Sequence, residues 1–336
     1  MRVAVCFNRA PSRPAKGCDA DLISEQGAEK EAAEVARALK SRGYDAHLVA
    51  LGPDPASFVD ALRRLSPAVA FNLCEGFWGE SRQEMHVASL FELLRLPYTG
   101  STPLSLGLTQ DKVRTKDLLL RYHLPTPGYT VARPGQHLLR SHDMAFPLIV
   151  KPRAEDASLG ITSDSVVGSD RALRERVRFI HETYRQEALI EEFIDGRELN
   201  AAVLGDRRLE VLPISEIVFE EGLPHPIVSY DGKWLESSIE FARTRPVCPA
   251  PLRTREEMLV RDVALRACKI LECRDYARVD IRLRDGIPYI LEVNANPDIC
   301  SDAGLARAAK TAEIPYPALI ERIVQMAIQR KEPSHA

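Results

Sequence analysis

Apolar runs of strand length alternate with helical patterns over the first hundred residues. Three such runs predict strands, at residues 3–7, 46–50 and 68–73. Three patterns at helical spacing predict helices, from residue 28 up to Gly43, at 58–65 and at 87–94. This alternating order predicts a parallel sheet covered by helices.

The pattern changes after Gly100 into an α+β block with hairpins. Helices are predicted at 112–122, 170–184, 253–271 and around 319–327. Strands are predicted at 147–151, 163–167, 188–193, 198–204, 209–217, 276–283 and 288–293. Residues 220–251 are polar and rich in proline, without a clear period. A loop of that length in a compact domain is usually a lid, a binding loop or disordered.

The last predicted pair of strands places carboxylates together. Polar residues alternate with apolar ones on both strands, and Asp285-Gly286 between them is a turn signal. With a three-residue loop at 285–287, Asp280 lies opposite Glu292 and Arg278 lies opposite Asn294. Two carboxylates and an amide oxygen suit Mg²⁺. A solvated polar face with cross-strand salt bridges is the alternative, and the pattern alone leaves both open.

Composition and charge exclude several classes of protein. The 336 residues include 45 Lys and Arg against 48 Asp and Glu, a net charge of -3, which gives no reason to expect nucleic-acid binding. The longest apolar runs are too short for a membrane span, and the N-terminus turns polar too early for a signal peptide. The 7 cysteines form no CxxC pair, which fits a reducing compartment. We therefore expect a cytoplasmic protein.

An ordered series of segments resembles an ATP-grasp enzyme, and most of all the D-alanine–D-alanine ligase family. The segments lie at 96–101, 111–112, 147–152, 189–198, 233–234, 248–250, 278–280 and 292–294. The resemblance implies a mixed α/β and α+β architecture, the ATP-grasp fold. It implies an N-terminal Rossmann-like domain at 1–105, and two α+β subdomains at 106–195 and 196–336 that enclose ATP.

The resemblance also implies a role for each matched residue of the nucleotide half. Lys112 and Lys151 would hold the α- and β-phosphates. The loop at 156–160, with Ser158 and Gly160, would close over the γ-phosphate, and Lys233 would reach the same phosphate from the long loop. The remaining nucleotide contacts would come from the adenine hinge Glu191, Glu192, Phe193 and Ile194, from Glu198 at the ribose, and from Leu291.

Four further residues match the catalytic end of the family's site. Asp280, Glu292 and Asn294 match the ligands of two Mg²⁺ ions, with Mn²⁺ as a possible substitute. Arg278 matches the arginine that stabilises the transferred phosphoryl group and the acyl-phosphate. The strand pattern had already placed these four residues on one face.

The implied reaction is the ATP-dependent joining of a carboxylate to an amine. The carboxylate attacks the γ-phosphate, and the amine then attacks the resulting acyl-phosphate. Three alternatives stay open, namely a true D-alanine–D-alanine ligase, an ATP-grasp small-molecule kinase, and a nucleotide-binding module without catalysis. The retained lysines, Arg278 and the metal ligands argue against the last.

The sequence departs from the family where substrates would bind. The family's acid after the first strand aligns only weakly with Glu25. A serine of the small loop becomes Ala157, the tyrosine after the loop lysine becomes Trp234, and the serine for the second substrate falls near Ala303.

These departures predict different, amino-acid-like carboxylate and amine substrates. The residues proposed to bind them are Arg9 or Arg82 for a carboxylate, Asp298 and Glu75 for an ammonium group, and also Glu25 and Ser301. The family is often dimeric, so a homodimer is a further expectation.

Overall fold

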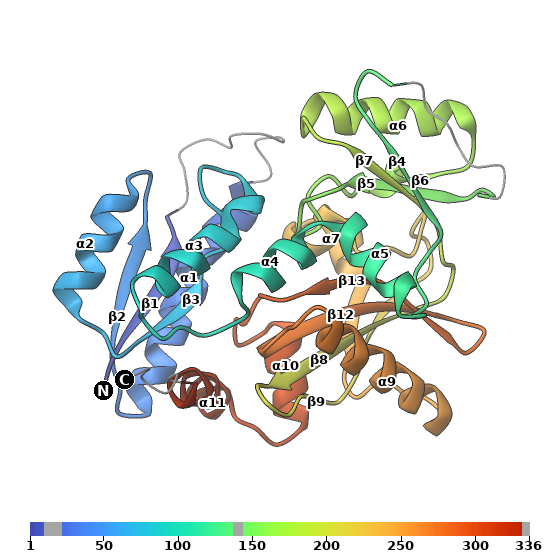
Figure 1. Cartoon of the computed structure of the whole chain (residues 1–336). Coiled ribbons are helices and arrows are strands. Elements are labelled where there is room, and N and C mark those ends of the chain that lie inside the picture. Colours follow the sequence, from blue (N-terminus) through green and yellow to red (C-terminus); the bar gives the residue numbers. More distant parts are fainter. Residues whose placement is uncertain (10–21, 137–143, 331–336) are drawn as a thin grey trace.

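The computed structural model describes residues 1–9, 22–136 and 144–330. Figure 1 shows the three sheets of the described residues, one on the left, one at the upper right and one beneath the second. None of the helices in the described ranges is long and apolar enough to span a bilayer.

The N-terminal sheet is parallel, as predicted. Its three strands, in the order β2-β1-β3, are β1 (Arg2–Asn8), β2 (Asp45–Leu51) and β3 (Val69–Leu73). Alternate residues of β1 enter two different apolar cores, because helices cover both faces of the sheet. These helices are α1 (Leu22–Ser41), α2 (Pro55–Leu65), and α3 (Glu84–Leu93), which follows the 3-10 turn η2 (Ser81–Gln83). Helix α1 begins six residues before the predicted start.

The second sheet is antiparallel. Its strands, in the order β4-β7-β5-β6, are β4 (Tyr129–Ala132), β5 (Leu148–Pro152), β6 (Val166–Val167) and β7 (Ala188–Glu192). The predicted strand at 163–167 is mostly a 3-10 turn, η3 (Ser163–Ser165), so β6 keeps only two residues. Three helices accompany this part of the chain, α4 (Pro103–Gln110), α5 (Lys112–Arg121) and α6 (Asp170–Thr183).

The third sheet carries the predicted carboxylates. Its main order is β11-β10-β8-β12-β13, with β9 paired to β8. The strands are β8 (Arg197–Gly205), β9 (Glu210–Val211), β10 (Ser215–Phe219), β11 (Thr244–Val247), β12 (Asp275–Arg284) and β13 (Ile287–Asn294). The helices of this region are α7 (Tyr230–Trp234), α8 (Ile239–Ala242), α9 (Thr254–Ile270), α10 (Gly304–Thr311) and α11 (Tyr316–Gln329). The segment 220–251, predicted as one irregular loop, therefore contains α7, α8 and β11.

The β12–β13 hairpin reaches the predicted register by a different route. Its loop has two residues, Asp285 and Gly286, both at positive φ, rather than the three that the sequence suggests. A β-bulge between this turn and the site restores the pairing of Asp280 with Glu292, since Ile281 pairs with Ile290 and leaves Leu291 as the extra residue. The bulge also explains why Ile290 enters the core while Glu292, two residues later, faces the site.

Candidate active site

The polar face of the β12–β13 hairpin forms the floor of the candidate site. Arg278 pairs with Asn294 and Asp280 with Glu292 across the two strands. The Arg278 guanidinium donates to both oxygens of Asp280, with Nε to Oδ1 at 2.7 Å and Nη2 to Oδ2 at 2.8 Å. Asn200 on β8 donates to Asp280 Oδ1 at 2.7 Å. The Asp280 carboxylate is therefore fixed from two strands.

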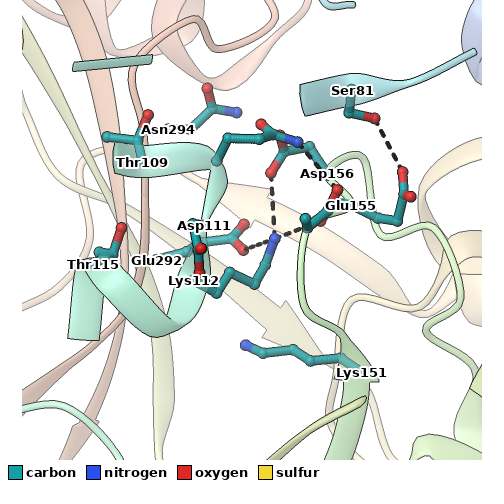
Figure 2. A network of polar contacts seen from close by, with 12 residues as sticks. Ser81, Thr109, Asp111, Lys112, Thr115, Lys151, Glu155, Asp156, Glu292 and Asn294 are labelled. Atoms are coloured by element: carbon teal, nitrogen blue, oxygen red, sulfur yellow. Dashed lines mark hydrogen bonds and ion pairs between the residues drawn. The ribbon is translucent and has the colours of Figure 1, made fainter. Parts of the chain in front are cut away.

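Lys112 connects this floor to the small loop at 156–160. Figure 2 shows its Nζ surrounded by three acceptors, the Glu155 carbonyl oxygen, Asp156 Oδ1 at 3.4 Å and Glu292 Oε2 at 3.6 Å. Lys112 is the first residue of α5, whose N-cap is the Asp111 side chain. The Asp-Lys pair of the sequence thus starts a helix and aims a cation into the site.

Lys112 and Glu292 are both ionised at neutral pH. Burial raises the pKa of Glu292, but Lys112, Lys151 and Arg278 together lower it to about 2. Burial opposes the charge on Lys112, but Asp156 and Glu292 raise its pKa above the ordinary lysine value. Glu292 is therefore an anion that can bind a cation, as a metal ligand must.

The predicted hinge lies next to these residues. Lys151 on β5 contacts Glu191 Oε2 at 2.6 Å, and Lys116 on α5 contacts Glu191 Oε1 at 2.5 Å. Phe193 and Ile194 are buried, whereas the partly exposed Glu192 pairs with Arg284 at 3.0 Å. The sequence reasoning missed Lys116, although it lies four residues after Lys112 and hence on the same helix face.

Glu198, the predicted ribose ligand, lies on the same face of β8 as Asn200. Its carboxylate accepts a hydrogen bond from Arg282 at 2.6 Å, and burial raises its pKa. Arg282 also donates to the Gly196 and Pro226 carbonyl oxygens, so it holds Glu198 in place. Leu291, also assigned to the nucleotide site, is the half-buried bulge residue of β13.

The two predicted lids contact each other. Trp234 Nε1 donates to the Ala157 carbonyl oxygen at 3.0 Å, and the Tyr230 amide donates to the Ile161 carbonyl at 2.8 Å. The same indole packs against α1, since a Cβ on Gly27 would lie 3.7 Å from the Trp234 ring. Lys233 Nζ lies over that ring, 4.9 Å from its centroid. Trp234 therefore joins the long loop, the small loop and the N-terminal region.

The small loop has a backbone that strongly favours glycine at its end. Ala157, Ser158 and Gly160 all have positive φ values of 54°, 61° and 71°. A Cβ on Gly160 would lie 2.8 Å from Pro152 Cγ and 2.9 Å from Tyr184 Cε2, so only glycine fits there. This close packing holds the end of the loop against β5.

Acidic side chains gather beyond Arg278, where the sequence departs from the family. Glu31 on α1 accepts from the Ile299 amide at 2.8 Å, and Asp298 accepts from the Cys300 amide at 2.9 Å. Burial, with Asp298 and Glu75 nearby, raises the pKa of Glu31. In the described part of the chain, no lysine or arginine forms an ion pair with Glu31 or Asp298, although Asp298 helps to raise the pKa of Arg278.

Glu31, Asp298 and Cys300 also form the only group of three acidic, histidine or cysteine ligand atoms found within 4.8 Å of one another among the described residues. It was not predicted as a metal site. The predicted set of Asp280, Glu292 and Asn294 offers two carboxylates and one amide oxygen, all of them hard ligands, and Asp280 lies directly opposite Glu292 in the hairpin. That chemistry fits Mg²⁺ better than a set containing a thiol.

The other predicted substrate residues are less closely grouped. The side chains of Arg9, Glu75, Arg82 and Ser301 are exposed. The backbone amide of Glu75 donates a hydrogen bond to Asn8 Oδ1 at 2.8 Å, and the backbone amide of Ser301 donates to Glu34 Oε2 at 2.8 Å. Glu25 belongs to α1, but its side chain lies outside the described residues.

Comparison with known proteins identifies the fold and the family. A solved structure of D-alanine–D-alanine ligase from Bacillus anthracis complexed with ATP superposes with a TM-score of 0.79 at 24% identity, over 99% of each chain. The fold is thus the ATP-grasp fold, an α/β domain followed by two α+β units. The family model described as "D-ala D-ala ligase C-terminus" matches residues 123–325.

Curated relatives extend the match over most of the chain. The D-alanine–D-alanine ligase of Hydrogenovibrio crunogenus is 32% identical over 304 residues, which are 89% of each chain. The uncharacterized protein y4sG of Sinorhizobium fredii is 40% identical over 81% of this chain and 77% of its own. The protein is an ATP-dependent carboxylate–amine ligase by class. It belongs to the D-alanine–D-alanine ligase family.

The Trp234 contact predicts how firmly the lids close. Trp234→Phe keeps an aromatic ring but loses the hydrogen bond to Ala157, a bond worth about 1 kcal/mol, so the open form should become about fivefold more populated. Limited trypsin cleavage after Lys233, followed by mass spectrometry, should be faster by that factor. Trp78→Phe alters an exposed tryptophan and serves as the matched control. Equal cleavage rates in the three proteins would contradict the proposed contact.

Proposed function

We propose that this ligase uses ATP to activate the carboxylate of an amino-acid-like substrate, and joins it to an amine other than the second D-alanine of a D-alanine pair. The observation that carries the proposal is the convergence of Arg278 and Lys112 on the paired carboxylates Asp280 and Glu292. Cations and acids in this arrangement suit the transfer of a phosphoryl group.

The nucleotide would lie between the second and third sheets. Lys112 Nζ lies 3.6 Å from Glu292 Oε2, and Figure 2 shows Lys151 extending toward the same region, so both lysines would bind phosphates placed beside Glu292. The amide groups of the loop 156–160 would face the γ-phosphate, and Lys233 would approach it from the other lid. Backbone groups at Glu191 to Ile194 would receive adenine, and Glu198 would receive the ribose.

Asp280, Glu292 and Asn294 would hold Mg²⁺. When bound, the ion neutralises negative charge on the transferring phosphates. Asn294 Oδ1 accepts a hydrogen bond from the Asn296 amide at 3.0 Å, which orients that oxygen. The bidentate contact from Arg278 orients Asp280 in the same way.

The chain's own residues account for the rest of the chemistry. A carboxylate is already a nucleophile, so the first step needs alignment with the γ-phosphate and no base. Arg278, partly exposed at the floor, is placed to neutralise the acyl-phosphate and the oxyanion formed when the amine attacks. The joined lids keep water away, which protects an intermediate that hydrolyses.

The direct test is phosphate release from Mg-ATP with pools of L- and D-amino acids and small acids. We expect release that depends on two pools, with a product lighter than the summed substrates by one water. Arg278→Met should reduce turnover by a factor of roughly 10² to 10³, because it removes a charge that acts in the transition state. It should leave ATP binding nearly unchanged, which a titration can confirm.

Other outcomes of that assay would overturn the proposal in distinct ways. Release with D-alanine alone would make the protein a true D-alanine–D-alanine ligase. ADP with a phosphorylated product and no free phosphate would make it a kinase. No turnover, together with intact ATP binding, would leave only a nucleotide-binding module.

The acidic group near Asp298 supports a substrate with an ammonium group. Asp298 lies close enough to Arg278 to contribute to its raised pKa, so this acid borders the reacting end of the site. An ammonium group of the substrate would form the ion pair that neither Glu31 nor Asp298 makes with a lysine or arginine of the described residues. Glu75 would add to the same negative field.

Asp298→Asn tests this assignment. The KM for the ammonium-bearing substrate should rise by about tenfold or more, because a charge-assisted hydrogen bond contributes about 1.5–3 kcal/mol. The KM for ATP should stay unchanged. Asp302→Asn is the matched control, since Asp302 is exposed and pairs with Lys30 at 3.7 Å. A parallel rise of both KM values would instead indicate a general disturbance of the site.

Homodimer formation also stays a prediction. Leu93 at the end of α3 is 82% exposed and Leu104 in α4 is 58% exposed, and α3 contacts α4. We expect this apolar face to bury itself against a second copy. Light scattering on the purified protein should then give twice the chain mass of 37.5 kDa.

A further inference from the structure

Glu191 is a buried carboxylate held between two buried lysines. Its Oε1 lies 2.5 Å from Lys116 Nζ and its Oε2 lies 2.6 Å from Lys151 Nζ. The side chains of Lys116 and Glu191 are each 1% exposed, and that of Lys151 is 7% exposed. The three residues come from α5, β7 and β5, so this cluster ties a helix to two strands.

The two lysines differ in how they are held. Lys116 also donates to Thr126 Oγ1 at 2.8 Å, and that hydroxyl donates to the Ile290 carbonyl at 2.8 Å. Lys151 has no second hydrogen-bond acceptor in the described part of the chain, and Figure 2 shows it reaching into the region that Lys112 and Glu292 border. Two acceptors, Glu191 and Thr126, therefore hold the Lys116 ammonium in place. The Lys151 ammonium is held by Glu191 alone among the described residues, so it can turn away from Glu191.

A buried carboxylate needs a cation beside it even when one of its two lysine partners moves away. Removing the cation from a buried ion pair is strongly unfavourable, because the remaining charge stays desolvated. Burial raises the pKa of Glu191, but the two lysines lower it below the ordinary value, so it is ionised. If Lys151 binds phosphate, another cation must stay on Glu191.

We propose that Lys116 is a positioning residue of the nucleotide site. Lys116 stays on Glu191 as its counter-ion while it is protonated, so that Lys151 can exchange Glu191 for the phosphates of ATP. This inference rests on the proposed placement of ATP and assigns a role to a residue outside the predicted set. Lys116 acts only through Glu191 and Lys151 and does not touch the nucleotide phosphates itself.

If Lys116 acts in this way, its charge makes the affinity for nucleotide depend on pH. The charged or titratable groups facing it are Glu191 on β7, Lys151 on β5, Glu292 on β13 and, 6.0 Å from its Nζ to the ring centroid, Tyr129 on β4. Burial is the largest influence and lowers the pKa of Lys116 to about 8, with Lys151 acting in the same direction against Glu191. Below pH 8 Lys116 carries its charge and frees Lys151. Above pH 8 it loses the charge, and Glu191 retains Lys151.

The experiment is a calorimetric titration of the protein with a non-hydrolysable ATP analogue and Mg²⁺, between pH 7 and 9.5. For the unaltered protein we expect affinity to fall above about pH 8, by up to about tenfold per pH unit, because binding then requires uptake of one proton. Lys116→Arg keeps its charge throughout this range, so it should remove the alkaline decline. Lys116→Met should bind about tenfold more weakly or worse already at pH 7. Lys310→Arg, at an exposed lysine of α10, should behave like the unaltered protein.

A second pair of variants isolates the route through Glu191. In a Glu191→Gln background there is no buried anion to neutralise, so adding Lys116→Met should change affinity by less than about twofold. This double variant also covers the case in which Lys116→Met alone does not fold. The inference is overturned if Lys116→Arg keeps the same alkaline decline, or if Lys116→Met weakens binding equally in both backgrounds. A protein that binds no nucleotide at any pH would overturn the ATP placement as well.

Discussion

The site depends on keeping negative charge inside the protein without leaving it unpaired. Asp280, Glu292 and Glu191 are wholly or largely removed from water, and each is met by a cation of the chain itself. Such pairs are stable only when geometry and hydrogen bonds compensate for lost hydration. Strands β7, β12 and β13 present the acids, while helix α5 supplies Lys112 and Lys116 from one face. The start of α5 is thus as important to the site as the hairpin.

The same arrangement would link ATP binding to closure of the two proposed lids. Lys112 contacts both Glu292 and the Glu155–Asp156 stretch that leads into the small loop, and Trp234 holds that loop to the long one. A ligand that binds Lys112 would therefore act at the start of the small loop. Gly160, wedged between Pro152 and Tyr184, gives this lid a fixed end about which the preceding residues can move. The ion pairs of Lys112 and the conformation of the small loop therefore depend on each other.

Much of the fold and half of the site could be read from local patterns. Strand alternation placed Arg278, Asp280, Glu292 and Asn294 on one face because side chains in a strand have period two. The strand β4 and the helices α4 and α10 were missed, since none of them is longer than eight residues. Lys116 and Glu31 were missed for another reason. Lys116 contacts Glu191 and Glu31 contacts Ile299, and in each pair the two residues are far apart in the sequence. A single sequence does not show which distant residues are in contact. The expected long loop gained short elements because tertiary contacts order residues that have no period of their own.

The bulge at Leu291 has a consequence for comparing and exchanging parts among relatives. A two-residue turn with one bulged residue and a three-residue turn without a bulge bring the same pair, Asp280 and Glu292, face to face. An alignment that places a gap at the tip must therefore place a compensating one near 291, or it will equate a core residue with a site residue. If Ile287 joined the turn to make a tip of three residues while Leu291 stayed bulged, β13 would shift by one position and Glu292 would lie opposite Ile281. Glu292 would then point into the apolar core, so the tip of this hairpin cannot be exchanged for that of a relative without regard to the bulge.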